Sequence, residues 1–204
     1  DIIEKVVITS THSYLVCFTS EGKAYKTKVY NIPEETRYSK GSSIKNVLNL
    51  KEEERVTTGV VIEDFDKEDE YLFMTTTKGV VKRVQVSNFK NIRTTGIIAI
   101  TLDEGDALRW VEHTNGKMDI LMVSSNGMVI RFDEQQVRSV GRTARGVRGM
   151  KLRQGDTLVG NSIIDPEEDR ESLLMIADSG IGKRTQVPKF RVQNRAGIGV
   201  IGIK

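Results

Sequence analysis

A unit of about fifty residues recurs four times along this chain, and this repetition constrains the fold more than any other feature. Each copy contains a short apolar run that ends at a turn glycine, and a strand with a basic residue follows the glycine. The four glycines are Gly22, Gly79, Gly127 and Gly180. This pattern is typical of a β-hairpin whose turn needs a positive φ.

A second landmark, an arginine followed by a glycine, comes after the basic strand of every copy. The four arginines are Arg37, Arg93, Arg142 and Arg195. An apolar strand then resumes, and in three copies it ends in a leucine, a three-residue loop and an acid: Glu54, Asp106 and Asp156. We expect these acids to accept hydrogen bonds from backbone amides in turns.

The landmarks divide the chain into repeats of approximately 1–50, 51–102, 103–152 and 153–204. Each repeat has room for about four short strands, which is the content of one propeller blade. Because one blade cannot bury both faces of its sheet, the blades must stack. The sequence therefore predicts an all-β, propeller-like single domain, 1–204, of about four four-stranded blades.

The charge of the chain follows the repeat. The net charge is only +3, but basic blocks between each turn glycine and its landmark alternate with acidic stretches such as 63–70 and 165–171. Stacked blades would align the basic blocks in one strip. A strip of Lys and Arg among small residues suits the phosphates of nucleic acid. The alternative is that these bases only solubilise the strand edges.

Several features favour duplex DNA bound through its backbone over base reading. The sequence has no recognition-helix or zinc-finger pattern, and aromatic residues make up only 6% of it. The first candidates for phosphate contact are the bases four residues after each turn glycine and the landmark arginines: Lys26, Arg83, Arg131 and Arg184, with Arg37, Arg93, Arg142 and Arg195. The second-rank candidates are Lys40, Lys82, Arg145, Arg148 and Lys183.

Catalytic and metal sites are not expected in this chain. His12 and His113 are the only histidines and lie in unlike contexts, and Cys17 is the only cysteine. The glycines of 197–202 match a dinucleotide fingerprint, but only two residues follow them, and 179–185 resembles a phosphate-binding loop only within a hairpin. We expect no cofactor, no metal and no membrane segment, since the apolar runs are far below the roughly 20 residues that a spanning helix needs.

Four segments carry a family resemblance, in order along the chain. They are 30–37 (Tyr-Asn-Ile-Pro-Glu-Glu-Thr-Arg), 93–100 (Arg-Thr-Thr-Gly-Ile-Ile-Ala-Ile), 143–149 (Thr-Ala-Arg-Gly-Val-Arg-Gly), and 182–185 (Gly-Lys-Arg-Thr) with 194–196 (Asn-Arg-Ala). With them the chain resembles the C-terminal domain of DNA gyrase A subunits, in the type IIA topoisomerase family. Topoisomerase IV, whose A subunit carries a degenerate version of this domain, is the close relative.

The resemblance implies a β-pinwheel, a disc whose blades exchange strands and which wraps duplex DNA around a basic rim in support of ATP-dependent negative supercoiling. The partners that it implies are the rest of the gyrase A subunit, together with the gyrase B subunit, while other parts of the enzyme use ATP and magnesium. It also implies a cytoplasmic, nucleoid-associated location and a domain that is monomeric in isolation.

The chain departs from the family pattern in two respects. The family domain typically has six blades, and its first carries a Gln-Arg-Arg-Gly-Gly-Lys-Gly box that does not occur here. We therefore expect a fragment or short variant that lacks the first and last blades. Three alternatives stay open: a topoisomerase IV type of domain, a protein-interaction propeller, and an enzyme that uses Glu54, Asp106 and Asp156 in a central channel.

Overall fold

The structure, a computed structural model, describes residues 6–203 and contains only strands and short 3-10 helices in that range. The all-β prediction is therefore confirmed. The strands are β1 (Tyr14–Thr19), β2 (Lys23–Lys28), β3 (Val56–Ile62), β4 (Tyr71–Thr76), β5 (Val80–Gln85), β6 (Ile97–Ile98), β7 (Leu108–Thr114), β8 (Asp119–Ser124), β9 (Met128–Asp133), β10 (Val147–Arg148), β11 (Leu158–Ile164), β12 (Ser172–Ile176), β13 (Gly182–Gln186) and β14 (Val200–Ile201). The 3-10 helices are η1 (Val29–Asn31), η2 (Ile44–Asn46), η3 (Val86–Phe89), η4 (Glu134–Gln136) and η5 (Val187–Lys189). Within 6–203, no helix has the length and apolarity needed to cross a membrane.

The four predicted hairpins are all present, as β1–β2, β4–β5, β8–β9 and β12–β13. Every turn glycine has a positive φ, from 73° at Gly127 to 81° at Gly180. A Cβ atom added to Gly127 would lie 2.6 Å from the carbonyl oxygen of Ile203. Glycine is therefore needed there both for the turn conformation and for the close approach of a later strand.

Each complete sheet combines strands from two sequence repeats. The strand orders are β3-β1-β2-β6, β10-β5-β4-β7 and β11-β8-β9-β14, all antiparallel. The hairpin in the middle of each sheet comes from one repeat, and the strands on both its edges come from the next. The sheets are therefore offset from the repeats 1–50, 51–102, 103–152 and 153–204 that the sequence defines.

Backbone hydrogen bonds fix the outer of these two exchanged strands onto the turn of the preceding hairpin. The carbonyl oxygen of Gly22 accepts from the amide of Ala99 at 2.8 Å, and that of Gly79 accepts from the amide of Gly149 at 2.8 Å. In the third sheet the carbonyl of Gly127 accepts from the amide of Gly202 at 2.8 Å. The same contact therefore joins successive repeats three times.

The hydrophobic core lies between successive sheets. In the largest cluster, Val16 and Phe18 of the first hairpin pack with Leu72 of the second and with Phe89 at the end of η3. The rings of Phe18 and Phe89 meet edge to face, with centroids 5.7 Å apart. A second cluster joins the second and third sheets in the same way. The faces between blades are thus buried against neighbouring blades, as the repeat predicted, while the other face of the first sheet is covered by its own β2–β3 connection, through Ile44, Leu48 and Leu50.

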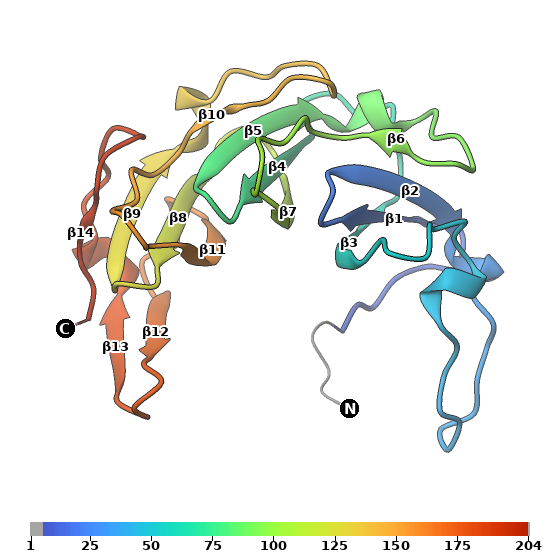
Figure 1. The fold of residues 1–204 in the computed structure, drawn as a ribbon, viewed down its shortest axis with the longest axis horizontal. Helices are drawn as coiled ribbons and strands as arrows, with labels where there is room; N and C mark the ends of the chain where they lie inside the picture. Colours follow the sequence, from blue (N-terminus) through green and yellow to red (C-terminus); the bar gives the residue numbers. More distant parts are fainter. Residues whose placement is uncertain (1–5, 204) are drawn as a thin grey trace.

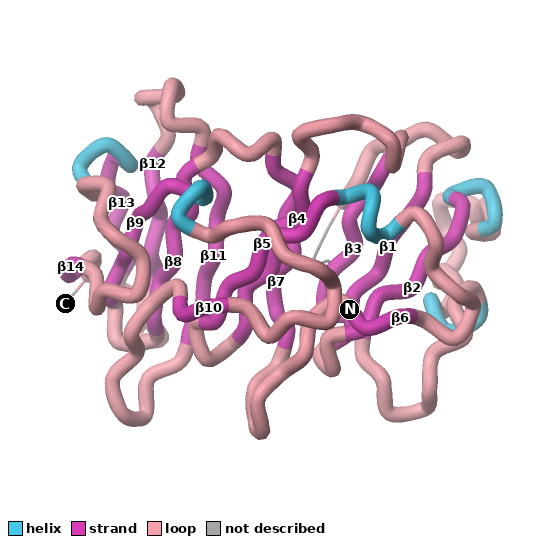
Figure 2. Tube along the Cα trace, turned by 90° about the horizontal axis from the view of Figure 1, so that it is seen from above, coloured by secondary structure: helices cyan, strands magenta, loops and turns pink. Residues whose placement is uncertain are grey.

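The sheets are arranged side by side around an open arc (Figure 1). The exchanged strands β3, β7 and β11 lie on its concave side, and β6, β10 and β14 lie on its convex side. Seen from the convex side, the strands of successive sheets run next to one another across the molecule (Figure 2). The fourth sheet differs from the expected four-stranded blade, because it contains only β12 and β13 among the described residues.

Candidate nucleic-acid interface

The landmark arginines of the last three repeats lie in the loops that lead into the outermost strands β6, β10 and β14. Arg142 Nη1 donates a hydrogen bond to the carbonyl oxygen of Ile98 at 3.2 Å, and Arg195 Nη1 donates to that of Arg148 at 3.0 Å. Arg142 and Arg195 therefore each contact the outermost strand contributed by the preceding repeat. Because a guanidinium has five N–H donors, these contacts leave donors for an anion. Arg93 is exposed.

Arg145 lies in the loop that leads into β10 and Arg148 lies in β10 itself, and both side chains are exposed. Arg145 Nη1 lies 2.8 Å from Asp103 Oδ1, in an ion pair whose two side chains are more than half exposed. Such a pair is weak and exchanges readily for another anion. The structure therefore places Arg93, Arg142, Arg145, Arg148 and Arg195 together on the convex side.

The landmark of the first repeat lies apart from this group. Arg37 and Lys40 are exposed in the long connection between β2 and β3, which leaves the arc at its end (Figure 1). The Cζ atom of Arg37 lies 5.3 Å from the centre of the Tyr38 ring. The structure therefore does not bring these two bases into the convex group.

The bases four residues after the turn glycines are mostly buried or paired instead of facing solvent. Arg131 is buried, with its Nε atom 2.7 Å from Asp119 Oδ2, and Arg83 Nη1 lies 3.7 Å from the buried Glu134 carboxylate. Lys26 Nζ donates to the carbonyl oxygen of Lys90 at 2.5 Å. Only Arg184 is exposed. The prediction that this set contacts phosphates does not fit the buried or paired positions of the first three.

Two second-rank candidates also have structural contacts. The side chain of Lys82 is fully buried, and its Nζ atom donates to the carbonyl oxygens of Ala99, at 2.7 Å, and of Arg142. Lys183 Nζ donates to the carbonyl oxygen of Gly202 at 2.8 Å, but this side chain is exposed. The Lys82 ammonium group therefore joins the second hairpin to two landmark segments and is buried away from the surface where the prediction places a phosphate.

Burial and the nearby Arg142 guanidinium lower the pKa of Lys82 from 10.5 to about 8. Both effects disfavour the charged form of the amine. The backbone carbonyls that accept from it compensate in part for the lost hydration. The ammonium group that holds the landmark segments is therefore unusually easy to deprotonate.

Three of the repeats share a further basic position that was not among the predicted contacts. Lys90, Arg138 and Arg191 lie eleven residues after the turn glycines of their repeats, and all three are exposed. The residue before each of them is a buried apolar anchor: Phe89, Val137 or Phe190. The constant spacing from the glycine was the available signal. The first repeat has Pro33 at this position, which hid the pattern.

Basic hollows lie on the surface where successive blades meet. The first has a volume of about 670 Å³ and is lined by Lys26, Lys90, Arg93 and Arg142. The second, of about 360 Å³, includes Lys82, Arg138, Arg145 and Arg195, and a third includes Arg191. We call the exposed or half-buried bases of this surface the basic rim: Lys90, Arg93, Arg138, Arg142, Arg145, Arg148, Arg191 and Arg195.

The three repeated acids cap turns, as predicted. Asp106 Oδ1 accepts from the amide of Lys78 at 2.9 Å, and Asp156 Oδ1 accepts from the amide of Asn126 at 3.1 Å. Glu54 Oε2 accepts from the amide of Lys51 at 3.0 Å. The acids therefore fasten the hairpin tips and tight turns, and within residues 6–203 no cluster of His, Cys, Asp and Glu has the geometry to hold a metal ion.

Comparisons with known proteins agree with this architecture. The model of the family described as "DNA gyrase C-terminal domain, beta-propeller" matches residues 13–63, 70–115, 119–164 and 171–204. The DNA gyrase A subunit of Staphylococcus epidermidis is 42% identical over 200 residues, and that of Haloquadratum walsbyi is 43% identical over 207 residues. These matches cover 98% and 100% of this chain but only 22% and 24% of the relatives, so the chain spans less than a quarter of their length.

Two solved structures are similar in fold. The C-terminal domain of a DNA topoisomerase IV has a TM-score of 0.85 at 28% identity, and covers 94% of this chain and 58% of its own. A DNA gyrase A C-terminal domain has a TM-score of 0.77 at 29% identity, with 94% and 60% covered. The fold of this chain, in which repeats exchange strands, therefore belongs to a known class, the β-pinwheels.

Replacing the capping acids will reduce stability without affecting the rim. We expect Asp106→Asn and Asp156→Asn each to lower the free energy of unfolding by about 1–3 kcal/mol, because a carboxylate that accepts turn amides is lost. Urea unfolding measures this loss, and binding of a duplex should change less than twofold. A stable variant with much weaker binding would show that these acids act at the interface.

The Asp156 effect will depend on pH. Burial alone would raise the pKa of this carboxyl, but hydrogen bonds from Ser125 and Asn126 outweigh burial and lower the pKa from 3.8. A lowered native pKa adds stability above the unfolded-state value, and this stability is lost as the pH falls through the native pKa. The difference between wild type and Asp156→Asn should therefore shrink below about pH 4.

Lys82 will give a pH dependence of the same sign in an alkaline window. Its native pKa of about 8 lies below the unfolded value of 10.5, so the unfolded chain binds more protons between these two values. The free energy of unfolding should therefore rise with pH across this window, by up to about 1.4 kcal/mol per pH unit from this group. Urea unfolding at pH 7.5, 8.5 and 9.5 measures the slope, and Lys82→Met should remove that contribution. An unchanged slope in the variant would contradict the assignment.

Proposed function

The chain belongs to the family of DNA gyrase C-terminal domains, and we propose that it binds duplex DNA along the basic rim and bends it around the convex side of the arc. The observation that carries this proposal is the recurrence of exposed bases at equivalent positions of successive blades. Stacked blades set these bases along one curved track, which suits a phosphate backbone.

The geometry supports contact with the backbone and not with base edges. The rim consists of arginine and lysine side chains on loops and short strands, without a helix that could enter the major groove. Bending a duplex costs free energy, of order 1–6 kcal/mol for a 20–30 base-pair site, and contacts on each further blade offset this cost. Binding should therefore strengthen with the number of blades that the duplex touches.

Within a gyrase, we propose that this domain presents bent DNA to a strand-passage enzyme whose catalytic and nucleotide-binding parts lie outside this chain. Its protein partners would be the B subunit of the enzyme, together with the remainder of the A subunit, and the bacterial nucleoid would be its place of action. This chain would need no cofactor for that role. The gyrase relatives at 42% and 43% identity favour this role over that of a topoisomerase IV domain.

Charge reversal on the rim tests the proposal. Arg138→Glu combined with Arg148→Glu should weaken binding of a 40-base-pair duplex at least tenfold, equally for unrelated sequences, because both side chains are exposed on the basic rim. If each of the eight rim bases neutralises one phosphate, log K should fall against log[salt] with a slope of about −7, and the variant's slope should be shallower by about 2. Fluorescence anisotropy across a salt series measures both quantities.

Arg109 provides the matched control. It is exposed on β7, on the concave side of the arc (Figure 1). Arg109→Glu introduces the same charge change at one position. If net charge alone determined DNA affinity, this reversal would weaken binding as much as each of the two rim reversals does. Equal weakening by the control, or a loss confined to one DNA sequence, would refute backbone binding along the rim.

A further inference from the structure

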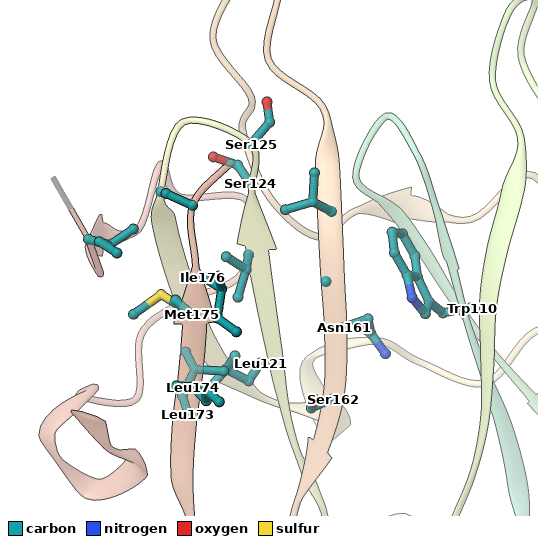
Figure 3. Close-up of a pocket in the computed structure, with 16 residues that line it drawn as sticks. Trp110, Leu121, Ser124, Ser125, Asn161, Ser162, Leu173, Leu174, Met175 and Ile176 are labelled. Atoms are coloured by element: carbon teal, nitrogen blue, oxygen red, sulfur yellow. The ribbon is translucent and has the colours of Figure 1, made fainter. Parts of the chain in front are cut away.

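The hollows of the molecule include an apolar kind and a basic kind. A cavity of about 410 Å³ beside β12 is lined by side chains such as Leu121, Leu174 and Met175 (Figure 3), and no charged side chain is among its described lining residues. The hollows of the convex side are lined by bases, among them Lys90 in the first and Arg145 in the second. A carboxylate of the chain that reaches a convex hollow therefore occupies donors that an incoming anion needs.

Asp103 reaches one of these bases. It lies in the turn between β6 and β7, and its Oδ1 atom accepts a hydrogen bond from Arg145 Nη1 at 2.8 Å. The Arg145 and Asp103 side chains are 71% and 58% exposed, so the contact lies at the surface that DNA would approach. In the chain without DNA, a carboxylate oxygen therefore takes the position next to Arg145 that the proposed function assigns to a phosphate oxygen.

Asp66 makes the same kind of contact with a second base of the rim. It belongs to the acidic β3–β4 loop, 63–70, and its two carboxylate oxygens accept from Lys90 Nζ at 2.8 and 2.6 Å. Both side chains are more than half exposed. The hydrogen bond and the charge of Asp66 raise the pKa of Lys90 above its usual 10.5, because a nearby carboxylate stabilises the ammonium form.

The other exposed bases of the rim have no acidic partner. Those that make no ion pair with an acid, among residues 6–203, are Arg93, Arg138, Arg148 and Arg191. The β7–β8 connection, which corresponds to the β3–β4 loop, contains only Asn-Gly-Lys-Met at 115–118 and has no acid that could reach Arg138.

The repeats differ in the same way at the position of Asp103. In the third repeat, Arg153 follows the last leucine as Asp103 follows Leu102, and Ile198 lies three residues after its landmark arginine as Arg145 does. The blade therefore forms without this ion pair, and the pairs of Asp66 and Asp103 are features of individual repeats.

We propose that Asp66 and Asp103 are internal counter-ions of the rim, which pair with Lys90 and Arg145 in the free chain and must be displaced by duplex phosphates. This inference rests on the DNA binding proposed above and names the residues that limit its strength. An unpaired base such as Arg148 gains a whole ion pair when it meets a phosphate, whereas Arg145 exchanges one ion pair for another. The displaced carboxylate also stays close to a polyanion, which repels it.

The counter-ions make the rim selective for a dense polyanion. Exposed ion pairs are weak, so they yield to duplex DNA, which carries one negative charge about every 1.7 Å along its axis. A single small anion gains little by replacing Asp103, because one ion pair is lost for the one that forms. The rim therefore binds DNA less tightly than its number of bases suggests, and it releases DNA more easily.

Removal of the Asp103 charge tests this proposal. Asp103→Asn should tighten binding of a 40-base-pair duplex about threefold, the effect of one exposed ion pair, because Arg145 is then free to meet a phosphate. Fluorescence anisotropy measures the affinity. Glu104→Gln is the matched control: this neighbouring side chain is exposed, and its carboxylate makes no ion pair within residues 6–203. It loses the same charge in the same turn and should change the affinity much less.

A double-mutant cycle separates competition for Arg145 from a general loss of negative charge. Arg145→Gln alone should weaken binding less than Arg148→Gln does, because only Arg145 has an acidic partner. Once Asp103→Asn is also present, Arg145→Gln should weaken binding as much as Arg148→Gln. The gain from Asp103→Asn should disappear when Arg145→Gln is present.

The second pair provides an independent repetition. Asp66→Asn should tighten binding about as much as Asp103→Asn, and the two substitutions together should give about a tenfold gain if their effects add. Glu68→Gln is the control in the same loop, since Glu68 is exposed and has no ion pair among the described residues.

Retention on phosphocellulose, eluted with a salt gradient, measures phosphate binding without DNA. Asp103→Asn should elute at higher salt than Glu104→Gln, and Arg145→Gln should abolish this difference. The proposal is overturned if Asp103→Asn and Glu104→Gln behave alike in both measurements, or if the gain from Asp103→Asn persists beside Arg145→Gln. A chain that shows the column differences but binds no duplex would refute the proposed function and still support the counter-ions.

Discussion

The hydrogen bond between the carbonyl of a turn glycine and a strand of the next repeat is the contact on which the rest of the structure depends. It recurs at Gly22, Gly79 and Gly127, and in each case the φ of the glycine is positive. Through it each hairpin acquires its outer strand, and the landmark loop that leads into this strand is fixed on the convex side. The position of the rim bases therefore follows from the connection between repeats.

The bases of this chain serve two purposes that the sequence does not distinguish. Arg131 and Lys82 are buried, and they donate to the carbonyl oxygen of Val187 in the next repeat and to landmark segments, respectively. Arg138 and Arg148 are exposed on the rim. A buried base that satisfies carbonyls or a carboxylate stabilises the junction, and a base on the loop beyond it stays available for an anion. Stacking and DNA binding thus use neighbouring residues of the same repeat.

The repeat itself made much of the fold predictable. Turn glycines such as Gly127 located all four hairpins, and the spacing to Asp106 and Asp156 identified the capping acids. Burial was not predictable in the same way, because a base four residues after the glycine can point toward solvent or toward the next blade. Arg131 contacts Asp119 only because the register of β8 and β9 places the two residues close together. The spacing of residues along the sequence does not contain this register.

The central claim is that the arc bends duplex DNA around its convex side, and the ring closure of short duplexes reports this most directly. A linear duplex of about 150 base pairs with cohesive ends, close to one persistence length, would be ligated in the presence of increasing amounts of this chain, and circles would be separated from linear products by gel electrophoresis. Because a bend brings the two ends of the duplex together, the account predicts a progressive rise in the yield of monomeric circles. An unchanged yield, at protein concentrations that retain all the duplex on a filter, would contradict it.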